Sequence, residues 1–212
     1  MHYYLLGDQC LIFSFGDVIS KELSHQVLCS YYALVNNESF LDQFQITDLV
    51  PSYNALAFHF LNDRKDKYIK LVVEAEQLIK TELKRKTKTW LKNSNQWQVD
   101  VSYCGHDLAR VASYTKLTEK EVIDLHCLET YQIAMLGFVP FFPYLIGLNP
   151  KLEVPRRQRA RVRVNKGSVA LAGKQTGIYS QSSPGGWNII GSTDFDLFES
   201  LKPGDTLKFN EI

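Results

Sequence analysis

The second half of the chain abandons helical spacing, and this change most restricts what it can fold into. From Gly137 onward the hydrophobic residues fall in short branched runs separated by Gly, Pro and Asn. These runs are ARVRV (160–164), SVALAG (168–173), GIYS (177–180), WNIIG (187–191) and DTLKF (205–209). Short strands with frequent turns are typical of a barrel or a sandwich, so we expect an all-β region here.

The first part alternates strand-like and helix-like segments instead. The residue patterns predict strands at 2–6, 10–15, 46–50, 55–60 and 97–103, and helices at 19–35 and 64–88. The second helix carries an apolar stripe that includes Ile69, Val73 and Ile79. This order predicts helices packed over an antiparallel sheet, a compact α+β layer.

Two shorter helices are expected after Cys104, in the segments 107–117 and 118–131. Asp107 is placed to cap the first helix, and Thr118 with Glu121 fits a capping box at the start of the second. The change of pattern places a domain boundary near residues 92–104, with Lys92–Asn95 as the linker. We therefore expect domains at 1–92 and 93–212.

Charge and cysteine content exclude several classes of protein. The formal net charge of +1 gives no general attraction to nucleic acid or to an anionic membrane. The 4 cysteines are scattered and form no CxxC pair, which favours reduced thiols over disulfides or a zinc site. No signal peptide and no membrane-spanning run is apparent, so we expect a cytoplasmic protein.

Known nucleotide and hydrolase motifs are missing from the chain. The segment GSVALAGKQ (167–175) fails as a phosphate-binding loop, because Gln175 stands where Ser or Thr should hold Mg²⁺ and the glycine spacing is wrong. No G-x-S-x-G, H-E-x-x-H or G-x-G-x-x-G occurs. We expect this chain alone to bind no metal and no ATP.

An arginine run occupies PRRQRARVRV (155–164). If this segment is a strand, Arg157, Arg159, Arg161 and Arg163 share one face and need anions. The anions are carboxylates of a partner, a substrate, or a phosphate. The alternative is a solvated edge strand protected by charge against aggregation. RNA binding is a third option that no basic field or aromatic motif supports.

His126 and two aromatic segments are further candidates. His126 is either an acid–base group or a hydrogen-bonded structural residue on a half-buried helix. GFVPFFPYLIGL (137–148) predicts a shaped loop rather than a strand, because its prolines deny ladder donors. SPGGW (183–187) is either a rigid lip that presents Trp187 to a ligand or a structural corner around a buried Trp.

Four ordered motifs resemble the family of the 5-oxoprolinase B subunit, also named kinase A inhibitor or allophanate hydrolase subunit 1. They are GFVPFFPYLIGL, PRRQRAR, GSVALAGKQTGIY and SPGGWNIIGST. The resemblance is strong over 122–209 and weaker in the first part, through LVPSYNAL (49–56). It implies the α+β fold class, with a ferredoxin-like α+β domain at 1–92 and a cyclophilin-like β-barrel at 93–212.

The resemblance also implies an activity. Family members act with a companion C subunit and a third subunit to hydrolyse 5-oxoproline to glutamate, and ATP is consumed by the complex. One branch inhibits a sporulation histidine kinase, and related domains occur in urea carboxylase. We expect a 5-oxoprolinase subunit, with a kinase inhibitor or an allophanate hydrolase-related subunit as alternatives.

Site residues follow from the same resemblance. The barrel face that meets a substrate or a partner is implied to include six residues: Phe138, Tyr144, Gln175, Tyr179, Ser183 and Trp187. Arg156 and Arg157 match the family's PRR and are expected to bind phosphoryl and carboxylate oxygens, with His126 as the proton-transfer group. The chain departs from the family at Phe141 and Lys174, where Gly is usual, and at Ser192, where Arg is usual.

Overall fold

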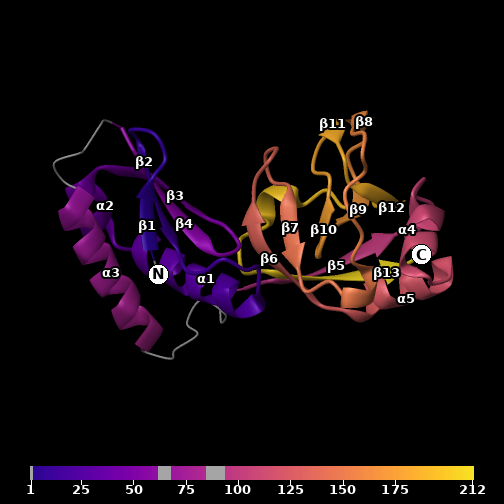
Figure 1. Cartoon of the computed structure of the whole chain (residues 1–212), viewed down its shortest axis with the longest axis horizontal. Helices are drawn as coiled ribbons and strands as arrows, with labels where there is room; N and C mark the ends of the chain where they lie inside the picture. The colour runs from indigo at the N-terminus through magenta and orange to yellow at the C-terminus, as the bar shows by residue number, and fades with distance from the viewer. Residues whose placement is uncertain (1, 62–67, 85–93) are drawn as a thin grey trace. The chain divides into compact units, whose positions relative to one another are not determined.

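The computed structural model describes residues 2–61, 68–84 and 94–212. Its internal contacts fall into two compact units, Met1–Asn93 (unit 1) and Ser94–Ile212 (unit 2), each described here by itself (Figure 1). The predicted linker at Lys92–Asn95 lies partly outside the described residues.

In its described residues, unit 1 is a four-stranded antiparallel sheet with three helices. The strand order is β1-β2-β4-β3. The elements are β1 (His2–Leu5), β2 (Cys10–Ser14), α1 (Lys21–Val35), α2 (Glu38–Phe44), β3 (Ile46–Pro51), β4 (Ala55–Phe60) and α3 (Tyr68–Lys84). The predicted hairpin, the strands expected up to residue 60 and the two long helices are present, although both ends of the helix predicted at 64–88 lie outside the described residues, and α2 was not predicted. The ferredoxin-like description of this unit stays a prediction.

Packing in unit 1 follows from strand alternation and helix periodicity. Phe13 of β2 and Phe58 of β4 are fully buried with ring centroids 5.1 Å apart. Helix α3 packs with Leu71, Val72, Ala75 and Ile79 buried. The predicted stripe was wrong at Ile69 and Val73, which are 79% and 58% exposed, because the buried face is rotated toward Leu71.

Unit 2 is built on a seven-stranded sheet in the order β12-β9-β10-β7-β6-β13-β5. A two-stranded ribbon, β11-β8, accompanies it. The strands are β5 (Gln96–Val101), β6 (Tyr131–Leu136), β7 (Pro143–Ile146), β8 (Arg161–Val164), β9 (Ser168–Ala172), β10 (Gln175–Ile178), β11 (Ser183–Gly185), β12 (Asn188–Ser192) and β13 (Thr206–Glu211). The helices are α4 (Leu108–Thr115) and α5 (Glu119–Leu128), with 3-10 turns η2 (Pro150–Leu152) and η3 (Phe198–Ser200).

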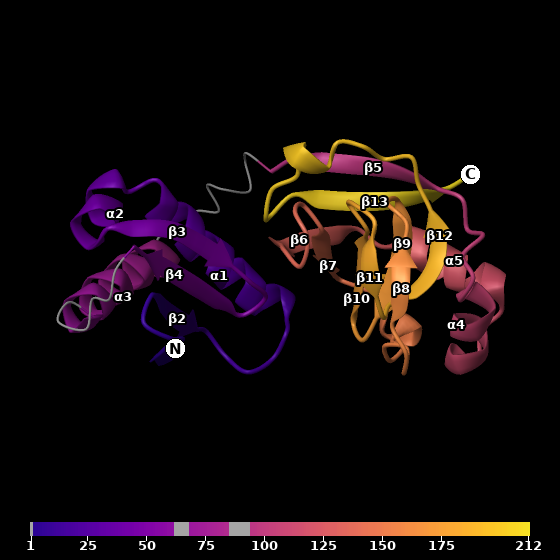
Figure 2. The same cartoon turned by 90° about the horizontal axis from the view of Figure 1, so that it is seen from above.

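The seven-stranded sheet curls into a nearly closed barrel, which is one of the two architectures that the strand pattern predicted and the one that the resemblance implied (Figure 2). Ser102, just past the end of β5, pairs with Ser192 at the end of β12, so the two outer strands of the sheet meet at one point. Gly105 continues this seam by donating its N–H to Ile190 O. A side chain at position 105 would overlap the backbone of β12, so this close approach requires glycine.

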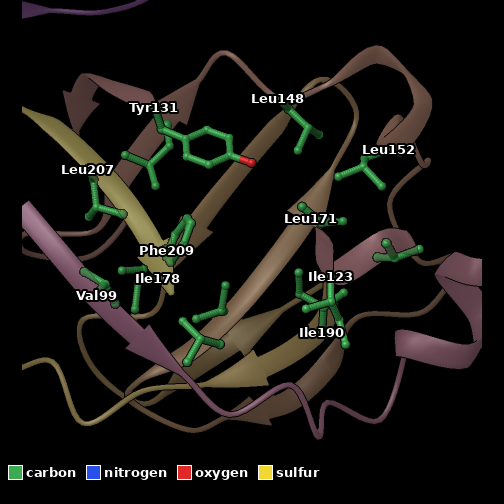
Figure 3. Close-up of a cluster of buried hydrophobic side chains, with 14 of the residues drawn as sticks. Val99, Ile123, Tyr131, Leu148, Leu152, Leu171, Ile178, Ile190, Leu207 and Phe209 are labelled. Atoms are coloured by element: carbon green, nitrogen blue, oxygen red, sulfur yellow. The ribbon is translucent and has the colours of Figure 1, made fainter. Parts of the chain in front are cut away.

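Inward-facing residues of the barrel form its core (Figure 3). Val169 and Leu171 of β9 face inward, whereas Ala170 and Ala172 face the opposite side. Helix α5 packs against β13, and the predicted capping box of Thr118 and Glu121 is present at its start.

Two local expectations for unit 2 were wrong. The segment 137–148 is not entirely a loop, because Pro143–Ile146 form β7 between β6 and β10. Pro143 is tolerated because it is the first residue of the strand. Asp107 occupies the N-cap position of α4, but its side chain makes no capping hydrogen bond and is used elsewhere.

Candidate functional site

Small residues on the outer face of β9 and β10 create the candidate site. Ala170, Ala172 and Gly177 leave room above the sheet, and large side chains from neighbouring strands and loops fill it. We call this set the aromatic cluster; it comprises Val139, Phe142, Tyr144, Val164, Ala170, Ala172, Tyr179, Trp187 and Ile189. The cluster lies on the opposite face of the sheet from the barrel core, since strand residues alternate between faces.

Phe142 is the centre of the aromatic cluster. Its ring centroid lies 4.8 Å from that of Tyr144, 5.2 Å from Tyr179 and 5.6 Å from Trp187. Tyr144 and Trp187 are also neighbours, at 5.7 Å. These tilted and edge-on pairs are the arrangements that aromatic rings prefer, so the rings hold one another in place.

The SPGGW segment is shaped by the packing of Tyr179 against it. A Cβ at Gly185 would overlap the Tyr179 hydroxyl, so only glycine fits there. Gly186 has no such constraint, because its nearest neighbour would be Ala160 Cβ at 3.8 Å. The main-chain N–H of Trp187 donates to the Tyr179 hydroxyl, and Trp187 is only 6% exposed. Trp187 therefore belongs to the floor of the site.

The loop before β7 projects two aromatic side chains outward. Phe138 and Phe141 are 62% and 41% exposed, and their φ angles are 65° and 61°. The loop is held by Val139 N–H to Gly137 O and by the Ser180 hydroxyl, which donates to Pro140 O at 2.6 Å. Phe141 thus stands in the left-handed region, where the resembled family has glycine and where a side chain is strained.

Two polar side chains on this face lack partners within the described part of the chain. Ser183 is 8% exposed, and its hydroxyl makes no hydrogen bond to any described residue. Gln175 is also 8% exposed and lies on the same face of β10 as Gly177. No described main-chain or side-chain group makes a hydrogen bond to the Gln175 side-chain amide. Buried polar groups are normally satisfied, so the buried Ser183 hydroxyl is a candidate for a ligand contact, and the Gln175 amide, on the same face as Gly177, is a second candidate by position.

Arg156 contributes positive charge near the phenols of the cluster. Burial raises the pKa of Tyr144, and the Arg156 charge opposes that rise. Burial likewise raises the pKa of Tyr179, opposed by the Trp187 N–H and more weakly by Arg156 and Arg161. Arg156 is exposed, and no ion pair to it is present among the described residues. It is therefore available to an anionic group that approaches the aromatic cluster.

Arg157 is placed differently from Arg156. It forms an ion pair with Asp107, whose side chain is 3% exposed. Arg161 binds the same carboxylate at 2.8 Å, and the Ile189 N–H donates to it at 2.8 Å. Burial alone would raise the pKa of Asp107, but the hydrogen bonds from Arg161 and Ile189 and the two guanidinium charges lower it. The chain itself thus supplies one of the anions that the arginine run needs, the Asp107 carboxylate.

The expected single face of four arginines was wrong. Strand β8 begins only at Arg161, and Arg159 lies in a bend before it. Arg159 and Arg163 are exposed, as expected of a solvated edge, while Arg157 and Arg161 are tied to Asp107.

His126 lies inside the barrel, apart from the other candidates. The Tyr103 hydroxyl is 2.6 Å from Nδ1, and Nε2 is 2.9 Å from Thr176 Oγ1. Because the Thr176 hydroxyl donates to Ala170 O, it must accept from Nε2–H, and Nδ1 then accepts from Tyr103. Burial lowers the His126 pKa to about 3, so the ring is neutral. Thr176 alternates with Gln175 along β10, so the sheet separates His126 from the aromatic cluster.

Two residues that organise this region were missed from the sequence. Asp107 is 50 residues or more from its arginine partners, and nothing local indicates such a pair. Asn188 is fully buried, receives a hydrogen bond from Arg110, and donates to Pro155 O and Leu171 O, both at 3.0 Å. An Asn next to Trp187 in an otherwise apolar strand was the available signal.

Outside the aromatic cluster, the described residues contain a further cavity but no metal site. No group of three or more His, Cys, Asp or Glu side chains there is arranged to hold a metal. Across the same residues, no helix combines the length and apolar character needed to cross a bilayer. A cavity of about 370 Å³ lies between β5 and the segment after β12, away from all the candidate residues.

The fold and this face together define a two-unit α+β chain whose barrel presents an aromatic candidate binding face. The chain belongs to the family described as carboxyltransferase domain, subdomain C and D, whose model matches residues 1–207. This result agrees with the resemblance to the 5-oxoprolinase B subunit that the ordered motifs indicated.

Curated relatives carry the same name. A protein of Bacillus subtilis named as the 5-oxoprolinase B subunit is 29% identical over 98% of this chain and 91% of its own length. A protein of Escherichia coli O157:H7 with that name is 45% identical over 112 residues, which are 50% of this chain. The aligned part spans 51% of that relative, about half its length.

Solved structures support the fold. The crystal structure of TTHA0988 matches 96% of this chain and 40% of its own, with 30% identity and a TM-score of 0.76. An uncharacterised protein, PH0987 from Pyrococcus horikoshii, matches the whole chain and 97% of its own, with 31% identity and a TM-score of 0.54. Urea carboxylase of Kluyveromyces lactis shares the fold at 15% identity and a TM-score of 0.70.

Proposed function

We propose that this chain is the B subunit of an ATP-dependent 5-oxoprolinase in the cytoplasm, acting with a companion C subunit and a third subunit. In that reaction water adds across the lactam C–N bond of 5-oxoproline to give glutamate, while ATP is hydrolysed to ADP and phosphate. The proposal is supported by the name shared by the relatives in Bacillus subtilis and Escherichia coli O157:H7. ATP is proposed to bind at the level of the complex, because the chain has no phosphate-binding loop.

The observation that carries the proposal is the pairing of an apolar aromatic floor with unpartnered polar groups. 5-Oxoproline is a flat five-membered ring with one carboxylate, one amide N–H and one amide oxygen. The rings of Tyr144 and Trp187 suit the ring faces, and Arg156 suits the carboxylate. The Gln175 amide and the Ser183 hydroxyl are suited to hydrogen bonds with the lactam.

The remaining predicted residues receive supporting roles in this proposal. Arg157 acts as a positioning residue, because its bond to Asp107 fixes the end of the PRR segment beside β12. His126 positions β10 through Thr176 and does not contact the substrate, since it lies on the other face of the sheet. Phosphoryl transfer and proton transfer are then assigned to groups that the other two proteins of the complex contribute.

Reconstitution tests the proposal directly. Glutamate and phosphate release from 5-oxoproline and ATP is measured with the three subunits together and with each one omitted. The expected result is activity only in the full mixture, with a stoichiometry of one phosphate per glutamate. A well-assembled mixture that leaves 5-oxoproline intact would refute the proposal. Turnover of allophanate in the same mixture would assign the chain to the urea carboxylase-related branch instead.

Variants locate the substrate within the complex. Arg156→Gln is expected to raise KM for 5-oxoproline about 10-fold or more, because a charge-assisted bond to the carboxylate is lost. Arg159→Gln removes a neighbouring exposed charge and serves as the matched control, with KM expected within about twofold of the parent. Equal effects of the two changes would indicate a general charge effect and remove Arg156 from the site.

Kinase inhibition is a second candidate because Phe138 and Phe141 are held outward by a hydrogen-bonded loop. Exposed aromatic side chains in a fixed loop suit a protein contact. Its test is autophosphorylation of a sporulation-type histidine kinase with and without the chain. Inhibition that Phe138→Ser abolishes would support this function, and no inhibition at micromolar concentrations would remove it.

A further inference from the structure

The barrel of unit 2 is open along part of one strand. Strand β5 pairs in parallel with β13, and the Thr206 and Ile212 N–H groups donate to Asn95 O and Val101 O. Odd-numbered residues of β5 therefore direct their main-chain groups toward β13. Successive peptide groups point to opposite sides of a strand, so the main-chain N–H and C=O of Gln98 and Asp100 face the other edge.

The opposite edge is closed at one end only. Ser102 exchanges two main-chain hydrogen bonds with Ser192, both 2.9 Å long. Thr193, the next residue, points its N–H to the opposite side and donates to Gly167 O at 2.9 Å, whereas Asp194, which follows it, makes no main-chain hydrogen bond to Asp100 within residues 94–212. Within residues 94–212 no main-chain or side-chain group is found bonded to the main chain of Gln98 or Asp100 on this side.

A cavity occupies the space that a neighbouring strand would fill. Its volume is about 370 Å³, and its lining includes Gln98, Asp100 and Ser102 on one side and Thr193 to Phe195 on the other. An open strand edge with unpaired N–H and C=O groups is a template for another strand. The cavity continues the line of the Ser102–Ser192 pair, so an incoming strand would extend the seam.

The surroundings define what that strand should carry. Val99 faces the barrel core, so alternate side chains of an added strand would lie beside it and Phe195. The side chains of Gln98 and Asp100 face solvent. The remaining side chains of the added strand would lie on that side, beside Asp100 and the exposed Asp194. A second copy of this edge is disfavoured, because antiparallel pairing would bring the aspartates of both copies together.

We propose that the open edge of β5, residues Gln98–Asp100, binds an extended segment of a partner protein by strand addition, with small apolar and basic residues alternating in that segment. Main-chain hydrogen bonds to Gln98 and Asp100 provide the docking. The carboxylates of Asp100 and Asp194 favour basic residues at the solvent-facing positions of that segment. This site is remote from the aromatic cluster, and the inference does not depend on which reaction the chain serves.

The first test is amide hydrogen exchange with a defined probe, the capped peptide Lys-Val-Lys-Val-Lys-Val. In the chain alone, the Gln98 and Asp100 amides should exchange fast and those of Val99 and Val101 slowly. Peptide at ten times its Kd should slow exchange at Gln98 and Asp100 about 10-fold. Slow exchange at both positions without peptide, or no protection at 5 mM peptide, would overturn the proposal, as would protection that rises with protein concentration alone.

Matched variants distinguish strand addition from adhesion by charge. Gln98→Pro removes one N–H of the open edge without breaking the ladder to β13, and should weaken peptide binding about 10-fold. Gln98→Thr keeps the N–H and should bind as the parent does. If Gln98→Pro does not fold, the pair Asp100→Lys and Asp194→Lys takes its place and should transfer preference to a Glu-Val peptide. A peptide N-methylated at alternate amides that binds equally well would refute strand addition.

Discussion

Acid is expected to destabilise unit 2 through His126, the imidazole enclosed in the barrel. Its ring is stacked on Phe209 at 4.4 Å, and both nitrogens are used in hydrogen bonds to Tyr103 and Thr176. Protonating Nδ1 would remove the acceptor that Tyr103 needs and place a charge against apolar neighbours. The folded state therefore resists the proton that the unfolded chain accepts readily.

The magnitude follows from the two pKa values. Burial lowers the His126 pKa from 6.5 to about 3 in the folded state. Below pH 6.5 the unfolded chain binds a proton that the folded chain does not, so the free energy of unfolding falls as the pH drops. The slope is about 1.4 kcal/mol per pH unit and levels off near pH 3. Between about pH 7 and about pH 5 the loss from this one group is about 2 kcal/mol.

Urea unfolding at the two pH values, followed by circular dichroism, measures this loss. His126→Gln is the matched control, because an amide can accept from Tyr103 and donate to Thr176 but does not titrate in this range. The parent should lose about 2 kcal/mol more than the variant on acidification, since the other titrating groups cancel. Equal losses in the two proteins, or a ring titration near the ordinary value by NMR, would refute the reasoning.

Three further changes test the architecture. Gly185→Ala should lower the free energy of unfolding by about 1–3 kcal/mol, because the added Cβ overlaps the Tyr179 hydroxyl. Gly186→Ala has room for its Cβ and should lower it by less than about 0.5 kcal/mol. Equal urea midpoints for the two variants would contradict this reasoning. Asp107→Asn should cost about 3–5 kcal/mol by urea unfolding at neutral pH, because two guanidiniums lose their carboxylate, and a cost below about 1 would show that the pair is dispensable. Phe141→Gly should raise the Tm in calorimetry. The change removes about 1–2 kcal/mol of strain from a left-handed backbone, which exceeds the cost of about 0.5–1 kcal/mol for ordering a glycine on folding. A lower Tm would mean that the contacts of the Phe141 ring stabilise the fold by more than this difference.

Much of the fold could be predicted because its elements have strong local signals. Helix α1 follows Ser20, whose hydroxyl accepts from Leu23 N–H, and α5 follows the Thr118 capping box. Helix α2 was missed because Asn36–Asn37 suggests an end to α1, whereas Asn37 also caps the next helix by accepting from Phe40 N–H. Strand β7 was missed because two prolines argue against a ladder, and only tertiary pairing with β6 and β10 decides it.

The site could be predicted in part. The ordered motifs selected Tyr144, Tyr179 and Trp187, whose rings the fold brings together around Phe142. Sequence spacing could not show that Asp107 neutralises Arg157, because the two meet only after the barrel seam forms. The burial of His126 likewise depends on β10 and β13, which lie far along the chain.

The parallel pairing of β5 with β13 has a consequence for synthesis on the ribosome. The first strand of unit 2 obtains its only ladder among the described residues from residues 206–211, about as far along the chain as unit 2 extends. While those residues are still in the exit tunnel, β5 and one edge of β6 have no strand to bind. Unit 1, whose whole sheet is encoded before residue 61, can complete its pairing much earlier. Until residues 206–211 emerge, a nascent chain of this protein should therefore expose a nearly complete but unclosed barrel, and need a chaperone most during that interval.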